Sequence, residues 1–109
     1  RQKADSIANA SGVYFEFQVE EPVTHISGGA PIYPADLRAA GVSGQVIAQF
    51  VVNTDGLVDT NTFKVLQASD DRFVAAVREA LPGMRFEPAK AGGRTVRQLV
   101  QQPFVFEIR

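Results

Sequence analysis

The chain has 109 residues and a mass of 11.8 kDa, which is the size of one domain around one core. Eleven basic and twelve acidic residues give a net charge of −1, which argues against a nucleic-acid partner because such proteins present a basic face. No apolar run approaches the roughly 20 residues that a membrane helix needs. Cysteine is absent and His25 is the one histidine, so we expect no enzyme, no metal site, no cofactor and no small-molecule substrate.

The first part of the chain predicts a lead-in followed by a strand. Arg1 stands where an initiating methionine would be, so we expect a piece of a longer protein. We predict that residues 1–12 are a polar lead-in or the end of a tether, and that residues 13–109 form a single domain. Residues 13–19 alternate between apolar and polar side chains, which predicts a half-buried strand.

A short helix and a hairpin follow. Pro34 suits the first position of a helix, which we place at residues 35–40. Alternation predicts a strand over residues 45–53, and the Gly56 turn predicts that it continues as a hairpin. In the return strand, residues 57–67, Val58 and Phe63 have opposite parity. Both can face the core only if a bulge lies between them.

The C-terminal part predicts a second helix and a long last strand. Residues 70–81 show a helical apolar stripe that ends at Pro82. A short extended piece at residues 84–89 precedes the strand that we predict over residues 96–108. Pro103 lies within that strand and cannot donate to a ladder, so it belongs at an edge or a bulge.

The connections predict the sheet. The crossover helix leaves strands 57–67 and 96–108 antiparallel to strand 45–53, in the order 57–67, 45–53, 96–108. Strand 13–19 would then lie antiparallel against either outer edge. The predicted fold is α+β: an antiparallel sheet of three to four strands with two helices packed on one face.

Several short motifs occur in an order that resembles one family. They are Pro31-Ile32-Tyr33-Pro34, Leu37 through Gly41, Gly44-Gln45-Val46, Phe50-Val51-Val52, Asp55-Gly56, Ala75-Ala76, Arg85-Phe86-Glu87-Pro88-Ala89 and Pro103-Phe104-Val105-Phe106. This set, spread over residues 31–109, resembles the TonB C-terminal domain family.

The resemblance implies a periplasmic domain in the cell envelope of a Gram-negative bacterium, with an inner-membrane anchor possible upstream of Arg1. Such a domain binds a segment of an outer-membrane receptor, which adds as a strand to the last strand, and it transmits energy for uptake. The residues to which the resemblance assigns this partner are Val96, Arg97, Gln98, Leu99, Val100, Gln101, Gln102 and Tyr33.

Two questions stay open at this level. Tyr33 could pack in the core, and the Gln98, Gln101, Gln102 and Arg97 side chains could simply face solvent. The same fold could also serve as a structural or accessory subunit of an envelope complex, without force transduction. That alternative gains support if strand 13–19 pairs with strand 96–108, because it would then cover the docking edge.

Overall fold

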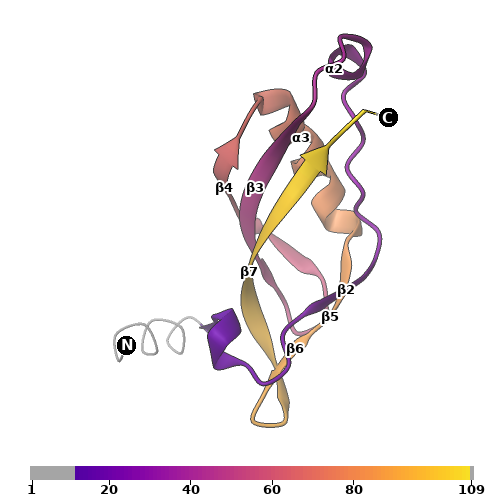
Figure 1. The fold of residues 1–109 in the computed structure, drawn as a ribbon. Helices are drawn as coiled ribbons and strands as arrows, with labels where there is room; N and C mark the ends of the chain where they lie inside the picture. The colour runs from indigo at the N-terminus through magenta and orange to yellow at the C-terminus, as the bar shows by residue number, and fades with distance from the viewer. Residues whose placement is uncertain (1–11, 109) are drawn as a thin grey trace.

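The computed structural model describes residues 12–108, and three long strands dominate it (Figure 1). They are β3 (Gly44–Val52), β4 (Val58–Ala68) and β7 (Arg94–Phe106). β3 lies between β4 and β7 and is antiparallel to both. This confirms the predicted strand order and the α+β class.

β4 carries the irregularity that the sequence predicts. Its register against β3 shifts twice, between Ile47 and Ala48 and again between Gln49 and Val51. The second shift falls between Asp59 and Lys64 of β4, where the side chain of Thr62 accepts a hydrogen bond from the Val51 amide at 2.8 Å. The bulge expected between Val58 and Phe63 is therefore confirmed.

Two helices pack on one side of this sheet, which we call its covered face. The helix α2 (Ala35–Ala39) follows Pro34, and α3 (Asp71–Ala80) continues into the 3₁₀ turn η2 (Leu81–Gly83). Asp70 caps α3 by accepting a hydrogen bond from the Arg72 amide. No helix in the described part of the chain is long and apolar enough to cross a membrane.

The core fills the space between the helices and the covered face. Its members are apolar side chains that are almost fully buried: Leu37, Val46, Ala48, Phe50, Val52, Val58, Phe73, Val77, Leu81, Met84, Phe86, Phe104 and Phe106. In β3 and β7 these are the even-numbered positions, as period-two alternation requires.

The structure also contains a second sheet, which has two strands. β2 (Thr24–Ser27) pairs antiparallel with β5 (Arg85–Glu87). The next strand, β6 (Ala89–Ala91), turns back at Gly92 and pairs with Arg94–Val96 of β7. Figure 1 shows these strands around the end of β7 opposite the C-terminus.

The prediction of a strand over residues 13–19 is wrong. Only β1 (Val13–Tyr14) is a strand, and it pairs with β7 in parallel, not antiparallel. The chain then turns through the 3₁₀ helix η1 (Glu16–Gln18), where the Phe15 amide donates to the Gln18 side chain at 2.9 Å. This local bond replaces the ladder bond that a longer strand would need. We call residues 12–28 the N-terminal arm. The lead-in predicted for residues 1–12 lies, apart from Gly12, outside the described residues.

Candidate functional site: the outer edge of β7

The backbone of β7 presents alternate residues to two sides. In β3 the Gln45 carbonyl accepts from Ser69 and the Val51 amide donates to Thr62, so the odd-numbered backbone groups of β3 face β4. The even-numbered groups therefore face β7. Paired residues in an antiparallel ladder either both face each other or both face away. Since Val46 lies opposite Phe104, the even-numbered groups of β7 face β3 and the odd-numbered groups face outward.

Pro103 fits this alternation. It lies opposite Ile47, at a position whose backbone groups face away from β3. Its missing N–H therefore costs the β3–β7 ladder no hydrogen bond. The outer edge keeps a carbonyl acceptor at Pro103 and complete amide and carbonyl pairs at Leu99, Gln101 and Val105. The expectation that Pro103 marks an edge is confirmed.

Part of β7 is already paired. β6 takes Arg94–Val96, and β1 pairs with Arg97 and Gln98. β1 therefore covers two residues of the outer edge, and no strand in the described part of the chain pairs with that edge from Leu99 onward. Of the predicted segment Val96–Gln102, the stretch from Leu99 to Gln102 lies on the uncovered edge.

The glutamines of β7 differ in their surroundings. Gln98 is only 2% exposed, and its side-chain carbonyl accepts from the Val23 amide at 2.9 Å. The alternative in which Gln98 faces solvent is therefore wrong, because the N-terminal arm crosses over this side chain. Gln101 is exposed and Gln102 is half-buried. Val96 is buried, and Val100 packs against the core.

Arg97 lies on the opposite, open face of the sheet. Its guanidinium donates to Asn53 Oδ1 and to Asp59 Oδ2, both at 2.9 Å. These contacts tie β7 to the β3–β4 hairpin, so the structure gives the Arg97 side chain an internal role. Leu99 is half-buried on the same face.

Tyr33 belongs to an aromatic cluster at the other end of β7. Its ring packs edge-on against Phe73 and Phe106, at centroid distances of 5.8 and 5.6 Å, and its hydroxyl donates to the Val42 carbonyl. The structure therefore brings Tyr33 to Phe106 and not to Leu99–Gln102.

A groove of about 220 Å³ lies beside the uncovered edge, on the covered face. β7 contributes Val100, Gln101 and Gln102 to it, together with the Gln98 side chain. The rest of its lining comes from residues far away in sequence: Glu16, Pro22, Val23, His25 and Phe86. We call this groove the arm pocket. No signal in the sequence predicts this pocket, because no local pattern relates the N-terminal arm to β7.

The main electrostatic network lies elsewhere, where α2 meets α3. Arg72 donates to Asp36 at 2.8 Å and to Asp70 at 2.9 Å. These hydrogen bonds lower the pKa of both carboxyl groups, and the two carboxylates raise the pKa of Arg72. The network joins the two helices. Within residues 12–108 no group of three histidine, aspartate or glutamate side chains could hold a metal ion.

Comparison with known proteins agrees with this geometry. The family model described as "Gram-negative bacterial TonB protein C-terminal" matches residues 29–108. Protein TonB of Pseudomonas aeruginosa is 35% identical over 79 residues, covering 72% of this chain and 22% of that protein. Protein TonB of Escherichia coli K12 is 35% identical over 83 residues, covering 69% of this chain and 34% of that protein. The chain thus spans a minor part of both relatives.

A solved structure matches most of the fold. The solution NMR structure of the Pseudomonas aeruginosa TonB C-terminal domain superimposes with a TM-score of 0.65 at 30% identity, over 80% of this chain and 87% of that one. The fold and its partly open sheet edge define a small two-layer α+β domain of the TonB C-terminal type. The chain belongs to the TonB C-terminal domain family. The family model begins at residue 29, so the whole N-terminal arm precedes the matched region.

Proposed function

We propose that this chain is a periplasmic, non-enzymatic protein-binding domain that takes up a segment of an outer-membrane receptor and transmits energy for uptake. The receptor segment adds as a strand to β7. The observation that supports this most is the outer edge from Leu99 to Val105, which is unpaired within the described structure and aims its odd-numbered backbone groups outward. Backbone hydrogen bonds would give affinity, and alternate side chains would give selection.

The opposite edge of the sheet is a poorer template. β4 is also an edge strand, but its register shifts twice along its length. Bulges of this kind interrupt the regular spacing that an added strand needs. β7 pairs with β3 without a register shift from Val100 to Phe106, so its outer edge is regular. This difference favours β7 as the docking strand.

A structural subunit of an envelope complex is the alternative. The pairing of β1 with β7 favours it, because β1 lies on the proposed docking edge. β1 covers only Arg97 and Gln98, however, and it leaves the edge open from Leu99 onward. We therefore retain the receptor-binding function.

Photo-crosslinking in the native envelope tests this proposal. A photoreactive residue replaces Gln101 in the full-length protein, and a control replaces Lys64, which is exposed on β4. We expect the Gln101 variant to capture a segment of an outer-membrane barrel receptor and the Lys64 variant to capture none. Capture of one partner at fixed stoichiometry from another envelope complex would instead establish the structural subunit.

A further inference from the structure

The arm pocket adjoins the place where an added strand would lie. Val100 and Gln102 point toward the covered face, as does Gln98, while the backbone of Gln101 faces the outer edge. A strand bonded to that edge also alternates its side chains between the two faces. Every second side chain of the added strand therefore points toward the covered face, and one of them meets the arm pocket.

The position of the pocket along the edge is set by the N-terminal arm. β1 leaves the edge after Tyr14, and η1 then carries Glu16 over to the rim of the pocket. The arm returns across Gln98, where the Val23 amide is bonded to the glutamine side chain. An added strand must therefore end beside η1, and this fixes which of its side chains reaches the pocket.

The lining of the pocket combines an apolar floor with a polar rim. Val23, Val100 and Phe86 supply apolar surface, and Phe86 is buried. Glu16 and Gln102 lie at the rim, and neither side chain has a hydrogen bond or ion pair with any other described residue. A matching side chain has an aliphatic stem and a tip that donates hydrogen bonds.

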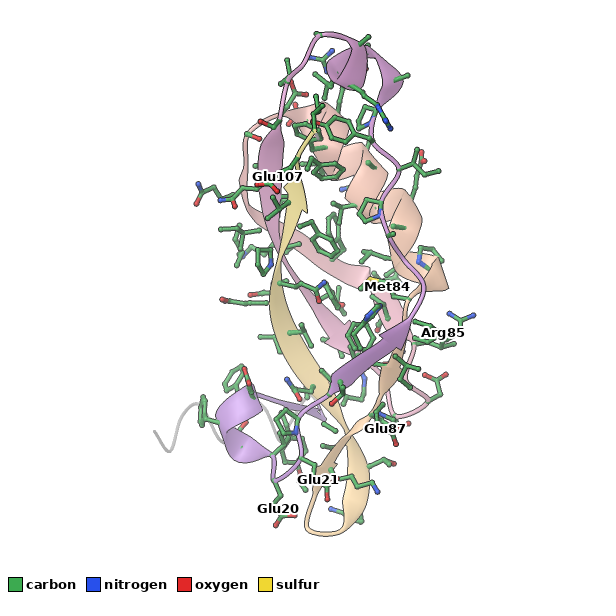
Figure 2. The ribbon with its side chains drawn as sticks, turned by 45° about the vertical axis from the view of Figure 1, so that its right-hand side comes forward. Glu20, Glu21, Met84, Arg85, Glu87 and Glu107 are labelled. Atoms are coloured by element: carbon green, nitrogen blue, oxygen red, sulfur yellow. The ribbon has the colours of Figure 1, made fainter. Side chains whose placement is uncertain are left out.

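The charges around the pocket determine which kind of side-chain tip binds there. Glu16 is the one aspartate, glutamate, lysine or arginine in the pocket lining. Glu20, Glu21 and Glu87 lie at the same end of the molecule, around the arm and β5 (Figure 2). Three further cations do not line the pocket: Arg85 in β5, Lys90 in β6 and Arg94 at the start of β7. Arg97 is paired with Asp59 on the open face. A cation is favoured here over an anion.

We propose that the arm pocket receives one lysine or arginine side chain of the strand that adds to β7. The proposal rests on strand addition as the function of this edge. The aliphatic stem lies over Val23 and Val100, the charged tip faces the Glu16 carboxylate, and Gln102 accepts a further hydrogen bond from it. The N-terminal arm, which precedes the region that the family model matches, thereby adds a specificity determinant to the family's fold.

Synthetic peptides test this with the full chain. The probes are seven-residue, end-capped peptides of alternating threonine and valine, with lysine placed in turn at each of the three central positions. Matched peptides carry methionine or glutamate there. Binding is followed by NMR, and the amides of Leu99, Gln101 and Val105 report whether the edge is occupied. We expect the best lysine peptide to bind about five-fold more tightly than its methionine match, since a partly exposed ion pair contributes up to about 1 kcal/mol.

Two variants separate the pocket from the edge. Glu16→Gln should remove the lysine advantage and leave the methionine peptide unchanged, whereas Glu107→Gln, just after the C-terminal end of β7 and away from the arm pocket (Figure 2), should change neither. Equal affinities for the lysine and methionine peptides, with the edge amides still shifting, would overturn the pocket proposal while strand addition stands. A complete lack of edge shifts with all peptides would overturn both.

Discussion

Phe50 shows how the core depends on single side chains. It is fully buried in the middle of β3, and the centroid of its ring lies 6.2 Å from the ring centroid of Phe86. We predict that Phe50→Ala lowers the free energy of unfolding by about 3–5 kcal/mol, because it removes a large apolar group and leaves a cavity. Urea unfolding measures this. The exposed Gln101→Ala should change stability by less than about 0.5 kcal/mol, and a similar small change for Phe50→Ala would contradict its place in the core.

Arg72 gives the stability a dependence on pH. Its hydrogen bonds to Asp36 and Asp70 lower the pKa of both carboxyl groups below 3.8 in the folded state. A lowered pKa adds stability above the unfolded value, and this is lost as pH falls through the folded value. We predict that Arg72→Gln lowers the urea midpoint at pH 7, and that the difference from the unmodified protein narrows below about pH 4. A difference that stays constant from pH 7 to pH 2 would contradict the assigned network.

At the scale of elements, the two edges of β7 have different roles: one pairs with β3, and the other is proposed to pair with a partner strand. The Gln101 amide faces outward and the Val100 amide faces β3. We predict that Gln101→Pro leaves the fold and its stability almost unchanged but abolishes capture of a partner strand, because one edge donor is lost. Val100→Pro removes a ladder bond and should destabilise the domain. Circular dichroism and the crosslinking assay together measure both effects. Undiminished capture by the Gln101→Pro variant would exclude docking on this edge.

The β3–β4 turn depends on a glycine that carries two constraints. Gly56 has a φ of +84°, and a Cβ there would meet the carbonyl of Phe86, whose amide donates to Gly56. Gly92 has a φ of +59° with open space around it, so it is the matched control. We predict that Gly92→Ala costs about 1–2 kcal/mol from the left-handed backbone alone. Gly56→Ala should lower the stability by more than Gly92→Ala. Equal melting temperatures for the two variants would show that β5 moves away from the new Cβ without loss of stability.

At the scale of the whole molecule, the domain is elongated, with principal extents of 48 × 27 × 22 Å. The long sheet explains this shape, since β7 has 13 residues and runs from the turn after β6 toward the C-terminus (Figure 1). Its last residue, Phe106, packs against Tyr33. The N-terminal arm covers one end of it, where it pairs with both β5 and β7.

We therefore predict that removal of residues 1–28 lowers the melting temperature but leaves the β4-β3-β7 sheet folded. The deletion exposes Phe86 and takes the Val23 amide from the buried Gln98 side chain. Hydrogen exchange should be faster in β5 and at Arg97, whose backbone faces β1, than in β3. Loss of protection throughout β3 would show that the arm is instead required for the whole fold.

The sequence by itself determined the elements whose reasons are local. Alternation in β3 and β7, the apolar stripe of α3, the Gly56 turn and the opposed parity of Val58 and Phe63 each follow from neighbouring residues, and all are present in the structure. The position of Pro103 on an edge follows in the same way. The ordered motifs also identified the family from residue 31 onward.

Only the tertiary structure decided what lies on the edge of β7. The alternation in residues 13–19 predicted a strand, but Phe17 is 76% exposed because the segment turns at η1 after two paired residues. The burial of Gln98, the tie from Arg97 to Asp59 and the arm pocket all join residues from distant parts of the chain. Pairing direction and edge coverage depend on where the remote elements dock, and the period of a single segment carries no information about that.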